Sequence, residues 1–280
     1  MANYTTVQIK ELREQTGAGM MDVKKALDEA DGDMAKALEI IRVKGLKGLV
    51  KREGRATSAG LVSAKVLDGA DGQSGVMIEF NSETDFVAKA EKFMDLANRI
   101  TEAAAKLDQV DLDGVLAAPL ADGGTVQEAI DALAATIGEK LQLRRATKVT
   151  GAHVDLYLHK TSPDLPPQVG VLLATDELGA ATAHDVAMHI AAYSPTFLTR
   201  DDVPAELVEN ERRIAEQIAI EEGKPEAALP KIVEGRMKGF FKENVLVEQA
   251  FAKDPKLTIA DVFAVERGAP TGFARFRVGA

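Results

Sequence analysis

The stretch that decides the fold runs from residue 76 to residue 87 and reads Val-Met-Ile-Glu-Phe-Asn-Ser-Glu-Thr-Asp-Phe-Val. Its first five residues favour a β-strand, and the polar residues after them indicate a turn. Upstream, apolar residues alternate over 62–66, which predicts a partner strand, and residues 68–72 carry the turn chemistry between the two strands. Downstream, apolar residues at helical spacing predict a long helix over 90–107. This order indicates an α+β fold.

The same order of elements recurs along the chain. In the first half, a Thr125–Glu128 capping box begins another helix and residues 141–149 read as a third strand. In the second half, strands are expected at 154–158, 169–174 and 272–278, with helices at 182–193 and from Thr258 onward. Strand, strand, helices and strand therefore occur twice. We predict two similar α+β core subdomains, residues 57–150 and 151–280.

Residues 1–56 differ from the remainder and read as a bundle of three short helices followed by a basic linker. Thr5 and Gln8 form a capping box at the first helix, and Gly17-Ala18-Gly19 ends it. Asp31-Gly32 ends the second helix, and Asp33 caps the third. From Lys44 to Ser58 the chain is rich in Lys, Arg and Gly, which predicts a solvated linker, helical or flexible, and a domain boundary near residue 57.

The second core half contains an insertion. Residues 204–222 and 225–247 are two amphipathic stretches around Gly223-Lys224-Pro225, which predicts a helical hairpin at about 204–247. Pro230 is expected to interrupt the second arm. Two interpretations are open: the hairpin contacts a partner, or it packs against the neighbouring sheet.

Composition excludes several classes of function. The chain has 280 residues and no cysteine, which excludes disulfides, thiolate metal sites and cysteine nucleophiles. Residues 1–56 carry 11 basic and 9 acidic side chains, whereas the remainder carries 23 and 35, a balance of −12. This acidic body, together with the absence of tryptophan, argues against direct nucleic-acid binding. The longest apolar run, 169–174, is too short to cross a membrane, so we expect a soluble, cytoplasmic chain without membrane contact.

The sequence offers little for catalysis. Gly17-Ala18-Gly19 lacks the third glycine of a dinucleotide fingerprint. His184 and His189 are five residues apart, whereas two ligands on one helix face would be four apart, so we expect polar residues along a helix and no metal site. Glu83 and Asp85 could act as acid and base, but capping of the following helix is the favoured interpretation. We therefore predict no catalytic residue, no metal and no cofactor.

Two apolar features lie where a partner could reach them. Phe86 stands at the entrance of a helix after a polar turn, and it either folds back into the core or projects outward. Met20 and Met21 are adjacent, so they cannot both face the core of one helix. We expect one of them to be exposed, where methionine suits an irregular partner surface, or to be half covered by its own bundle.

The residues that carry both features also match a known family. The run from Leu12 to Leu27, Leu-Arg-Glu-Gln-Thr-Gly-Ala-Gly-Met-Met-Asp-Val-Lys-Lys-Ala-Leu, resembles the N-terminal signature of the bacterial translation elongation factor Ts family. Thr84-Asp85-Phe86-Val87 is similar to the second signature of that family. Further agreement lies at residues 137–139, 187–192 and 233–237, so the resemblance covers nearly the whole chain in order.

The resemblance implies a guanine nucleotide exchange factor that binds elongation factor Tu, a GTPase, in GDP-bound and nucleotide-free forms. Such a factor perturbs the magnesium and phosphate site of the GTPase and speeds GDP release without covalent chemistry. The N-terminal bundle would resemble a ubiquitin-associated domain. The residues that would contact the GTPase are Leu12, Arg13, Met20 and Met21 in the bundle, Thr84, Asp85, Phe86 and Val87 beside the magnesium site, and His159 in the second core half.

Two departures from the family pattern carry expectations of their own. Some members have a further C-terminal module that contacts the GTPase, and because this sequence stops at Ala280 we expect that contact to be missing. The hairpin corresponds to an element that pairs two factors in some members, which makes it a candidate for self-association.

The rival interpretations are an RNA-binding protein that uses the basic run 44–55, a hydrolase that uses Glu83 and Asp85, and an adaptor that binds partners without affecting nucleotide release.

Overall fold

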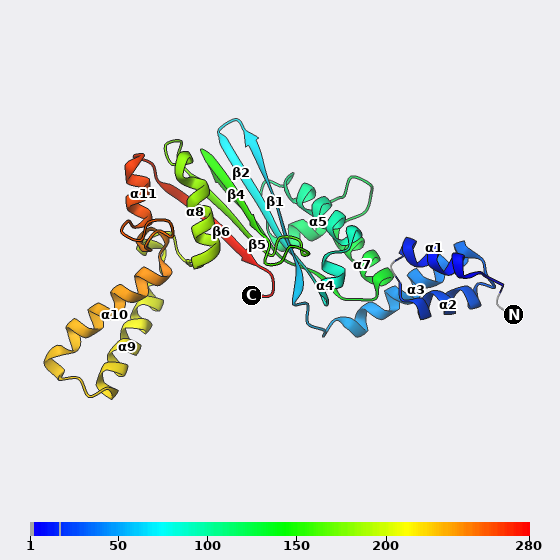
Figure 1. Cartoon of the computed structure of the whole chain (residues 1–280), viewed down its shortest axis with the longest axis horizontal. Coiled ribbons are helices and arrows are strands. Elements are labelled where there is room, and N and C mark those ends of the chain that lie inside the picture. Colours follow the sequence, from blue (N-terminus) through cyan, green and yellow to red (C-terminus); the bar gives the residue numbers. More distant parts are fainter. Residues whose placement is uncertain (1–2, 17) are drawn as a thin grey trace.

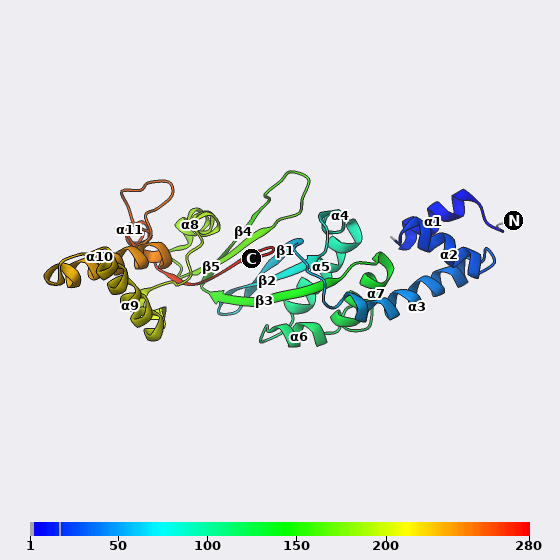
Figure 2. The same ribbon diagram turned by 90° about the horizontal axis from the view of Figure 1, so that it is seen from below.

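The computed structural model describes residues 3–16 and 18–280, and it is elongated. A helical bundle lies at one end, two β-sheets with their helices form the middle, and a helical hairpin lies at the other end (Figures 1 and 2). The mixed α and β composition confirms the predicted fold class. The division into subdomains at residues 57 and 151 stays a prediction. No helix in the described ranges is both long and apolar enough to cross a membrane.

Three helices form the N-terminal bundle: α1 (Thr6–Thr16), α2 (Met20–Glu29) and α3 (Met34–Arg52). The capping box at α1 is confirmed, because Thr5 N donates to Gln8 Oε1 at 2.8 Å and Gln8 N donates to Thr5 Oγ1 at 3.3 Å. Asp33 caps α3 as predicted, since its Oδ1 accepts from Ala35 N at 2.9 Å. The predicted role of Gly17 in ending α1 lies outside the described residues. The bundle core consists of Ile9, Leu12, Ala18, Val23, Ala26, Leu27, Ala30, Ala37 and Ile41.

The third helix extends beyond the bundle and joins it to the sheets. The predicted linker is therefore helical as far as Arg52. Helix α3 packs on α7 (Val126–Ile137), and the two backbones come so close that a Cβ on Gly45 would lie 2.1 Å from the carbonyl oxygen of Ala135. The Arg52 side chain also donates to the carbonyl of Ala134 at 3.2 Å. Glycine is required at position 45 because any side chain there would push the two helices apart.

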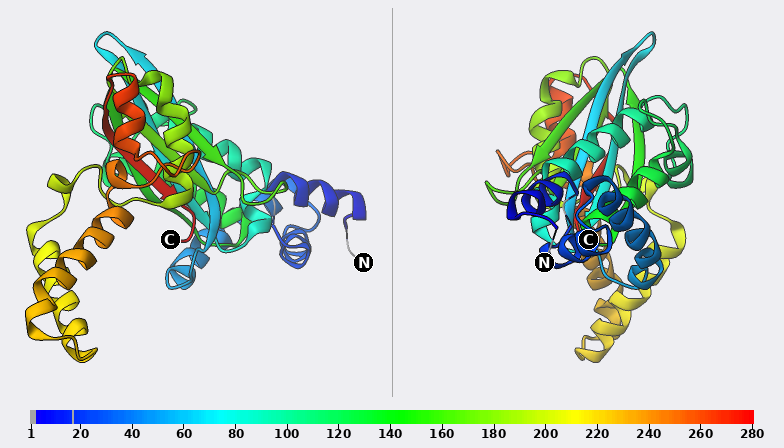
Figure 3. Two further views of the ribbon diagram at one scale, coloured as in Figure 1. Left: turned by 60° about the vertical axis from the view of Figure 1, so that its left-hand side comes forward. Right: turned by 90° about the vertical axis from the view of Figure 1, so that its right-hand side faces the viewer.

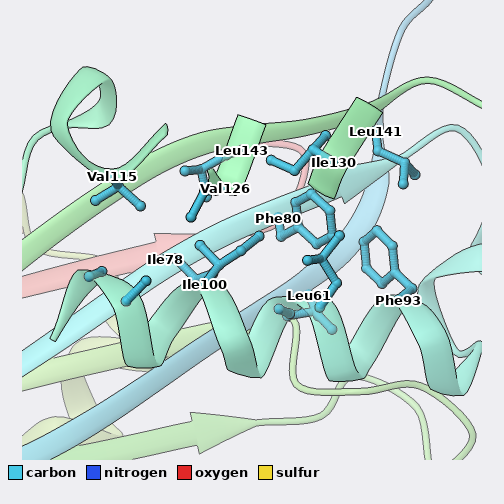
Figure 4. Close-up of a cluster of buried hydrophobic side chains, with 14 of the residues drawn as sticks. Leu61, Ile78, Phe80, Phe93, Ile100, Val115, Val126, Ile130, Leu141 and Leu143 are labelled. Atoms are coloured by element: carbon cyan, nitrogen blue, oxygen red, sulfur yellow. The ribbon is translucent and has the colours of Figure 1, made fainter. Parts of the chain in front are cut away.

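The first sheet has the order β1 (Ala59–Gly69), β2 (Gly72–Ser82), β3 (Leu141–Gly151), and both strand pairs are antiparallel. One face is covered by α5 (Glu91–Ala104), α6 (Leu112–Ala117) and α7, with the short helix α4 (Asp85–Ala88) directly after β2. Figure 4 shows the core between this face and its helices. Phe80 of β2 and Phe93 of α5 stack there with ring centroids 4.4 Å apart. The turn after β2 is thus attached to a well-packed core on both sides.

The second sheet repeats this order with β4 (His153–His159), β5 (Val169–Thr175) and β6 (Pro270–Arg277), again antiparallel. Helices α8 (Ala180–Tyr193) and α11 (Ile259–Val265) cover its outer face. The two sheets pack face to face through a shared core that includes Val62, Met77, Val154, Leu172 and Phe276. The middle of the molecule therefore has four layers: helices, sheet, sheet, helices.

The hairpin consists of α9 (Ala205–Glu221) and α10 (Leu229–Asn244), and it extends away from the sheets (Figure 3). Its small core of Ala215, Val233 and Met237 lies between its own two arms, so the interpretation that it packs against the sheet is wrong. Pro230 occupies the first turn of α10. Backbone N–H groups in the first turn have no acceptor within the helix, so a proline there removes no hydrogen bond. The expected interruption of the second arm is therefore also wrong. Short 3₁₀ helices lie at Arg200–Asp202, Glu226–Ala228 and Leu246–Glu248.

Candidate protein-interaction site

The turn between β2 and α4 carries the second signature segment. Ser82 is the last residue of β2, and its Oγ donates to the carbonyl oxygen of Thr84 at 2.9 Å. Thr84 is the N-cap residue of α4, but no side chain caps this helix. Glu83 bonds outside the helix instead: it accepts from Lys140 N at 2.6 Å and from the Arg55 guanidinium at 3.2 Å. The expectation that Glu83 caps the helix is therefore wrong.

Phe86 projects outward from this turn. Its side chain is 73% exposed, and the Lys89 ammonium lies 4.8 Å from the ring centroid. Of the two interpretations of this ring, the structure supports the outward one. Asp85 is exposed beside it in the first turn of α4. The exposed ring and carboxylate give this corner of the molecule an apolar and an anionic group side by side.

The residues after Phe86 face the other way. Val87 and Ala88 are buried in the core under the first sheet. The expectation that the Val87 side chain contacts a partner is corrected: only 8% of it is exposed, so it anchors the turn that presents Phe86. Thr84 is half-buried, and both its hydroxyl and its N–H bond to Glu139.

Glu139 is a residue of this site that our reasoning from the sequence did not select. Its Oε1 accepts from Thr84 Oγ1 at 2.7 Å and its Oε2 accepts from Thr84 N at 3.1 Å. The only signal in the sequence was that residues 137–139 agree with the family pattern, and this agreement does not reveal a contact with Thr84. The two residues are 55 positions apart in the chain, so local patterns could not pair them.

The N-terminal bundle presents a second exposed group. Met20 is 51% exposed and Met21 is 63% exposed, because both lie in the first turn of α2, at its edge. The sequence predicted one exposed methionine, and the structure shows two. Arg13 is exposed as well. Leu12 requires a correction, since its side chain is fully buried in the bundle core and leaves no surface for a partner.

The first signature segment is linked to the helix that follows the second one. Lys92, in the first turn of α5 and six residues after Phe86, donates through Nζ to the carbonyl oxygens of Glu14 (3.2 Å) and Gln15 at the end of α1. A cavity of about 170 Å³ separates the bundle from the end of α7, lined on one side by Ala18, Gly19 and Asp22 and on the other by Thr136, Ile137 and Gly138. The bundle is therefore held close to the segment that bonds to the turn of Phe86.

His159 lies apart from these residues, at the exposed end of β4 in the second sheet. Its Nδ1 is 3.1 Å from the hydroxyl of Tyr157. In the described ranges no hydrogen bond or ring contact links it to Phe86 or to the bundle. If all three regions contact one partner, that partner must span both sheets.

Three residues of the basic run 44–55 have partners within the chain. Lys44 forms an ion pair with Glu29, Arg52 donates to the Ala134 carbonyl, and Arg55 pairs with Glu83. The side chains of Lys47 and Lys51, also part of the basic run, lie outside the described residues. Within the described ranges no group of three or more His, Asp or Glu side chains could hold a metal ion.

The two histidines of α8 have different surroundings. His184 is exposed, with Nδ1 3.2 Å from Asp155 Oδ2. His189 is buried: its Nδ1 accepts from Ala252 N at 3.2 Å, so Nε2 carries the proton that bonds Gln249 Oε1 at 2.9 Å. Burial lowers the pKa of His189, and the bond to Gln249 opposes this only in part. This histidine therefore stabilises the second core half in its neutral form.

Comparison with known proteins identifies the family. A sequence model described as "Elongation factor TS" matches residues 83–280. A relative from Beutenbergia cavernae named "Elongation factor Ts" is 63% identical over 282 residues, and one of the same name from Micrococcus luteus is 62% identical over 282 residues. Each alignment covers all of this chain and all of the relative. A relative from Bifidobacterium animalis subsp. lactis, again of that name, is 52% identical. The chain therefore belongs to the elongation factor Ts family, which acts in translation elongation.

Proposed function

We propose that this protein binds elongation factor Tu, perturbs the magnesium and phosphate site of that GTPase, and so speeds the release of GDP. In this proposal the protein forms and breaks no covalent bond. Membership of the elongation factor Ts family supports the partner and the process. The observation that carries the mechanism is the outward position of Phe86, a large apolar ring that is 73% exposed on a turn anchored by buried neighbours.

An exposed ring on a fixed turn favours insertion into a partner. Burying a phenylalanine side chain is worth about 1.5–3 kcal/mol. Because Val87 and Ala88 are packed in the core of the protein itself, ordering the turn costs little additional entropy when the ring inserts. Asp85 would enter beside the ring and bring a negative charge close to a site that already holds phosphates.

A magnesium site is sensitive to such an intrusion. Mg²⁺ demands near-ideal octahedral geometry, keeps several waters and takes few protein ligands. In GTPases the ion bridges phosphate oxygens, so a shift of the surrounding loops weakens the metal and phosphate contacts together. Insertion of Phe86 and Asp85 next to this site would therefore loosen GDP without any contact to its base.

The free energy needed to accelerate GDP release exceeds what the burial of one phenylalanine ring supplies. A nucleotide bound with nanomolar affinity and associating at about 10⁶–10⁷ M⁻¹s⁻¹ leaves at roughly 10⁻³–10⁻² s⁻¹. Release about 10⁴-fold faster needs about 5.5 kcal/mol of differential stabilisation. Phe86 accounts for at most about half of this, so further contacts must hold the ring in place. We assign them to Arg13, Met20 and Met21 on the bundle and to His159 on the second sheet.

The coupling is reciprocal. If binding of this protein weakens the binding of GDP to the GTPase by a given free energy, binding of GDP weakens the binding of this protein by the same free energy. The same reciprocity holds for GTP. A nucleotide-free complex is then the intermediate, and whichever nucleotide is more abundant displaces the factor. The protein accelerates exchange in both directions and does not select the product.

The remaining organisation follows from this role. We propose that residues 1–56, 57–150 and 151–280 act as separate binding units on one partner in the cytoplasm, where elongation takes place. The hairpin is a candidate for self-association. Ile218 and Ile220 of α9, which are 41% and 56% exposed, lie outside its small core and could support that pairing.

The test is the release of a fluorescent GDP analogue from elongation factor Tu in a stopped-flow instrument, with and without this protein. We expect acceleration that saturates with concentration and competes with added magnesium. Binding without acceleration would show an adaptor, and binding of RNA with a steep salt dependence would favour the nucleic-acid interpretation. The exchange function is refuted if GDP release is not accelerated, whichever of these two binding results accompanies it.

A further inference from the structure

Two carboxylates hold the turn of Phe86 and the end of α7 to each other. We propose that Glu139 is a positioning residue for nucleotide exchange: with Glu83 it forms a reciprocal clamp that fixes the turn from which Phe86 projects. We call Glu83, Thr84, Glu139 and Lys140 the carboxylate clamp. This inference rests on the proposed function for its kinetic consequence, but its structural consequence can be measured on the protein alone.

The clamp consists of two adjacent pairs that exchange hydrogen bonds. Glu139 accepts from the backbone N–H of Thr84 at 3.1 Å and from the Thr84 hydroxyl at 2.7 Å. Glu83 accepts from the backbone N–H of Lys140 at 2.6 Å. Each segment thus supplies a carboxylate to the backbone of the other. Hydrogen bonds to an ionised group are about twice as strong as neutral ones, and here two of the three donors are rigid backbone groups.

The backbone places Glu139 for this contact. Helix α7 ends at Ile137 and is capped by Gly138, which adopts the left-handed conformation with φ of 88° and whose N–H bonds to Ala134 O at 2.9 Å. The chain therefore turns sharply between the last residue of the helix and Glu139. A Cβ at Gly138 would meet no atom within 4 Å, so the glycine is required for its φ and not for space.

The turn needs this support because its own helix is too short to be rigid. Helix α4 has four residues and no side-chain cap, and an isolated helix of one turn is unstable. Val87 and Ala88 secure its far side by burial. On the near side the clamp bonds Thr84, two residues before Phe86, while the ring itself is 73% exposed and lies under the Lys89 ammonium. Without the clamp, the ring would be presented over a wider range of positions.

Arg55 extends the clamp to the N-terminal bundle. Its guanidinium bonds both oxygens of Glu83 at 3.2 Å, and it lies three residues after the end of α3. The position of the turn is therefore tied to the same helix that carries the bundle. The structure thereby couples the surface that would supply affinity to the turn that would perturb the nucleotide site.

Three variants separate a positioning role from a general structural role. Glu139→Ala removes both bonds to Thr84. Glu139→Gln can restore both, because its amide oxygen can accept from Thr84 N and its amide nitrogen can donate to the hydroxyl oxygen. Thr84→Val removes the hydroxyl bond alone. Glu91→Ala is the matched control, since it removes an exposed carboxylate from the first turn of α5, a side chain with no hydrogen bond or ion pair among the described residues.

The first measurement uses the protein without its partner. The chain contains no tryptophan, so Phe86→Trp introduces a single tryptophan at the exposed position, and this residue can be excited at a longer wavelength than the three tyrosines. Time-resolved anisotropy then reports nanosecond motion of residue 86. We expect Glu139→Ala to increase the amplitude of this local motion clearly, Thr84→Val to increase it less, and Glu139→Gln and Glu91→Ala to leave it near the parent value. Circular dichroism melting of each variant establishes that it is folded.

The second measurement is GDP release from elongation factor Tu with the variants in the Phe86 background. At saturating factor, Glu139→Ala should lower the maximal release rate roughly 10-fold, because a misplacement of about 1 Å can cost up to 100-fold in a positioned reaction. The concentration for half-maximal effect should change less than about threefold, since the clamp is not itself the contact surface. Glu139→Gln should recover most of the loss.

The outcomes distinguish the two proposals. If wild-type protein fails to accelerate GDP release but Glu139→Ala still mobilises residue 86, the proposed function is refuted and the clamp stands. If wild type accelerates release while Glu139→Ala changes neither the anisotropy nor the maximal rate, the clamp is refuted alone. A lower rate without increased motion would also overturn it, because Glu139 would then act by direct contact. Should Glu139→Ala fail to fold, Thr84→Val and Glu139→Gln decide between these results.

Discussion

Replacing Phe86 by alanine should slow nucleotide exchange without destabilising the protein. The ring is 73% exposed in the free protein, so about three quarters of its surface remains to be buried by a partner. At about 1.5–3 kcal/mol for a fully buried phenylalanine, this surface is worth about 1–2 kcal/mol, or roughly 5–30-fold in rate. Because the side chain makes little contact with its own fold, the free energy of unfolding should change by less than about 0.5 kcal/mol.

The assay is stopped-flow release of a fluorescent GDP analogue over a range of factor concentrations, with urea unfolding of the same samples. If the ring acts in the transition state for release, the maximal rate falls by the stated factor and the half-saturating concentration changes less. Val265→Ala is the matched control, because that side chain is also 73% exposed but lies at the end of α11, on the second sheet. It should leave both parameters unchanged.

Two results would refute this reasoning. An unchanged maximal rate with weaker binding would show that Phe86 is an anchor that contributes affinity but does not perturb the nucleotide site. A loss of several kcal/mol in stability would show that the ring packs in its own core, contrary to its exposure in the structure. Phe86→Leu, which keeps most of the apolar surface, should lie between wild type and Phe86→Ala in rate.

Three further variants test the rest of the account. Met20→Ala combined with Met21→Ala should weaken calorimetric binding to elongation factor Tu roughly 10–50-fold with an unchanged melting curve, since both side chains are more than half exposed. Gly45→Ala should cost about 1–3 kcal/mol in urea unfolding, because its Cβ would lie 2.1 Å from a carbonyl oxygen of α7, whereas Gly235→Ala, at an open helical position, should not destabilise. The pKa of His189 is lowered in the folded protein, so the unfolded chain binds the proton first as the pH falls. The contribution of neutral His189 to stability is therefore present above about pH 6.5 and declines below it. His189→Gln should reduce the difference between the urea midpoints at pH 7.5 and pH 5.5.

Features governed by neighbouring residues could be predicted from the sequence. The capping boxes at Thr5 and Thr125 form as expected, because each depends on residues three positions apart. The helix expected from Thr258 onward also begins there, with a third capping box. The strands and their order were also predictable, since alternation and turn residues are local signals. The resemblance to the elongation factor Ts family rested on continuous runs of sequence and is confirmed.

Features governed by packing between distant segments could not be predicted in the same way. Val87 belongs to a signature segment, but its burial depends on helices and strands elsewhere in the chain. Glu83 read as a helix cap because of its position, whereas its partners Arg55 and Lys140 are distant in sequence. Glu139 was missed for the same reason. A family signature identifies the segment, and only the fold shows which of its side chains reach the surface.

The position of the hairpin also depends on packing that the sequence alone does not predict. Its two helices were evident from amphipathic spacing, but whether they pack on the sheet or extend from it depends on the crossing at their base. The small core between the arms needs no other cover, which is why the hairpin can project into solvent (Figure 3). Pro230 was read as an interruption because helix start positions are uncertain by several residues from sequence alone.

The most direct test of the central claim is the position of Phe86 in a crystal structure of the nucleotide-free complex with elongation factor Tu. Our account predicts that the ring loses nearly all of its exposed surface to the GTPase and lies beside the displaced magnesium ligands, with Asp85 next to it. A ring that is still exposed to solvent in the complex, or that has folded back against its own first sheet, would contradict the account.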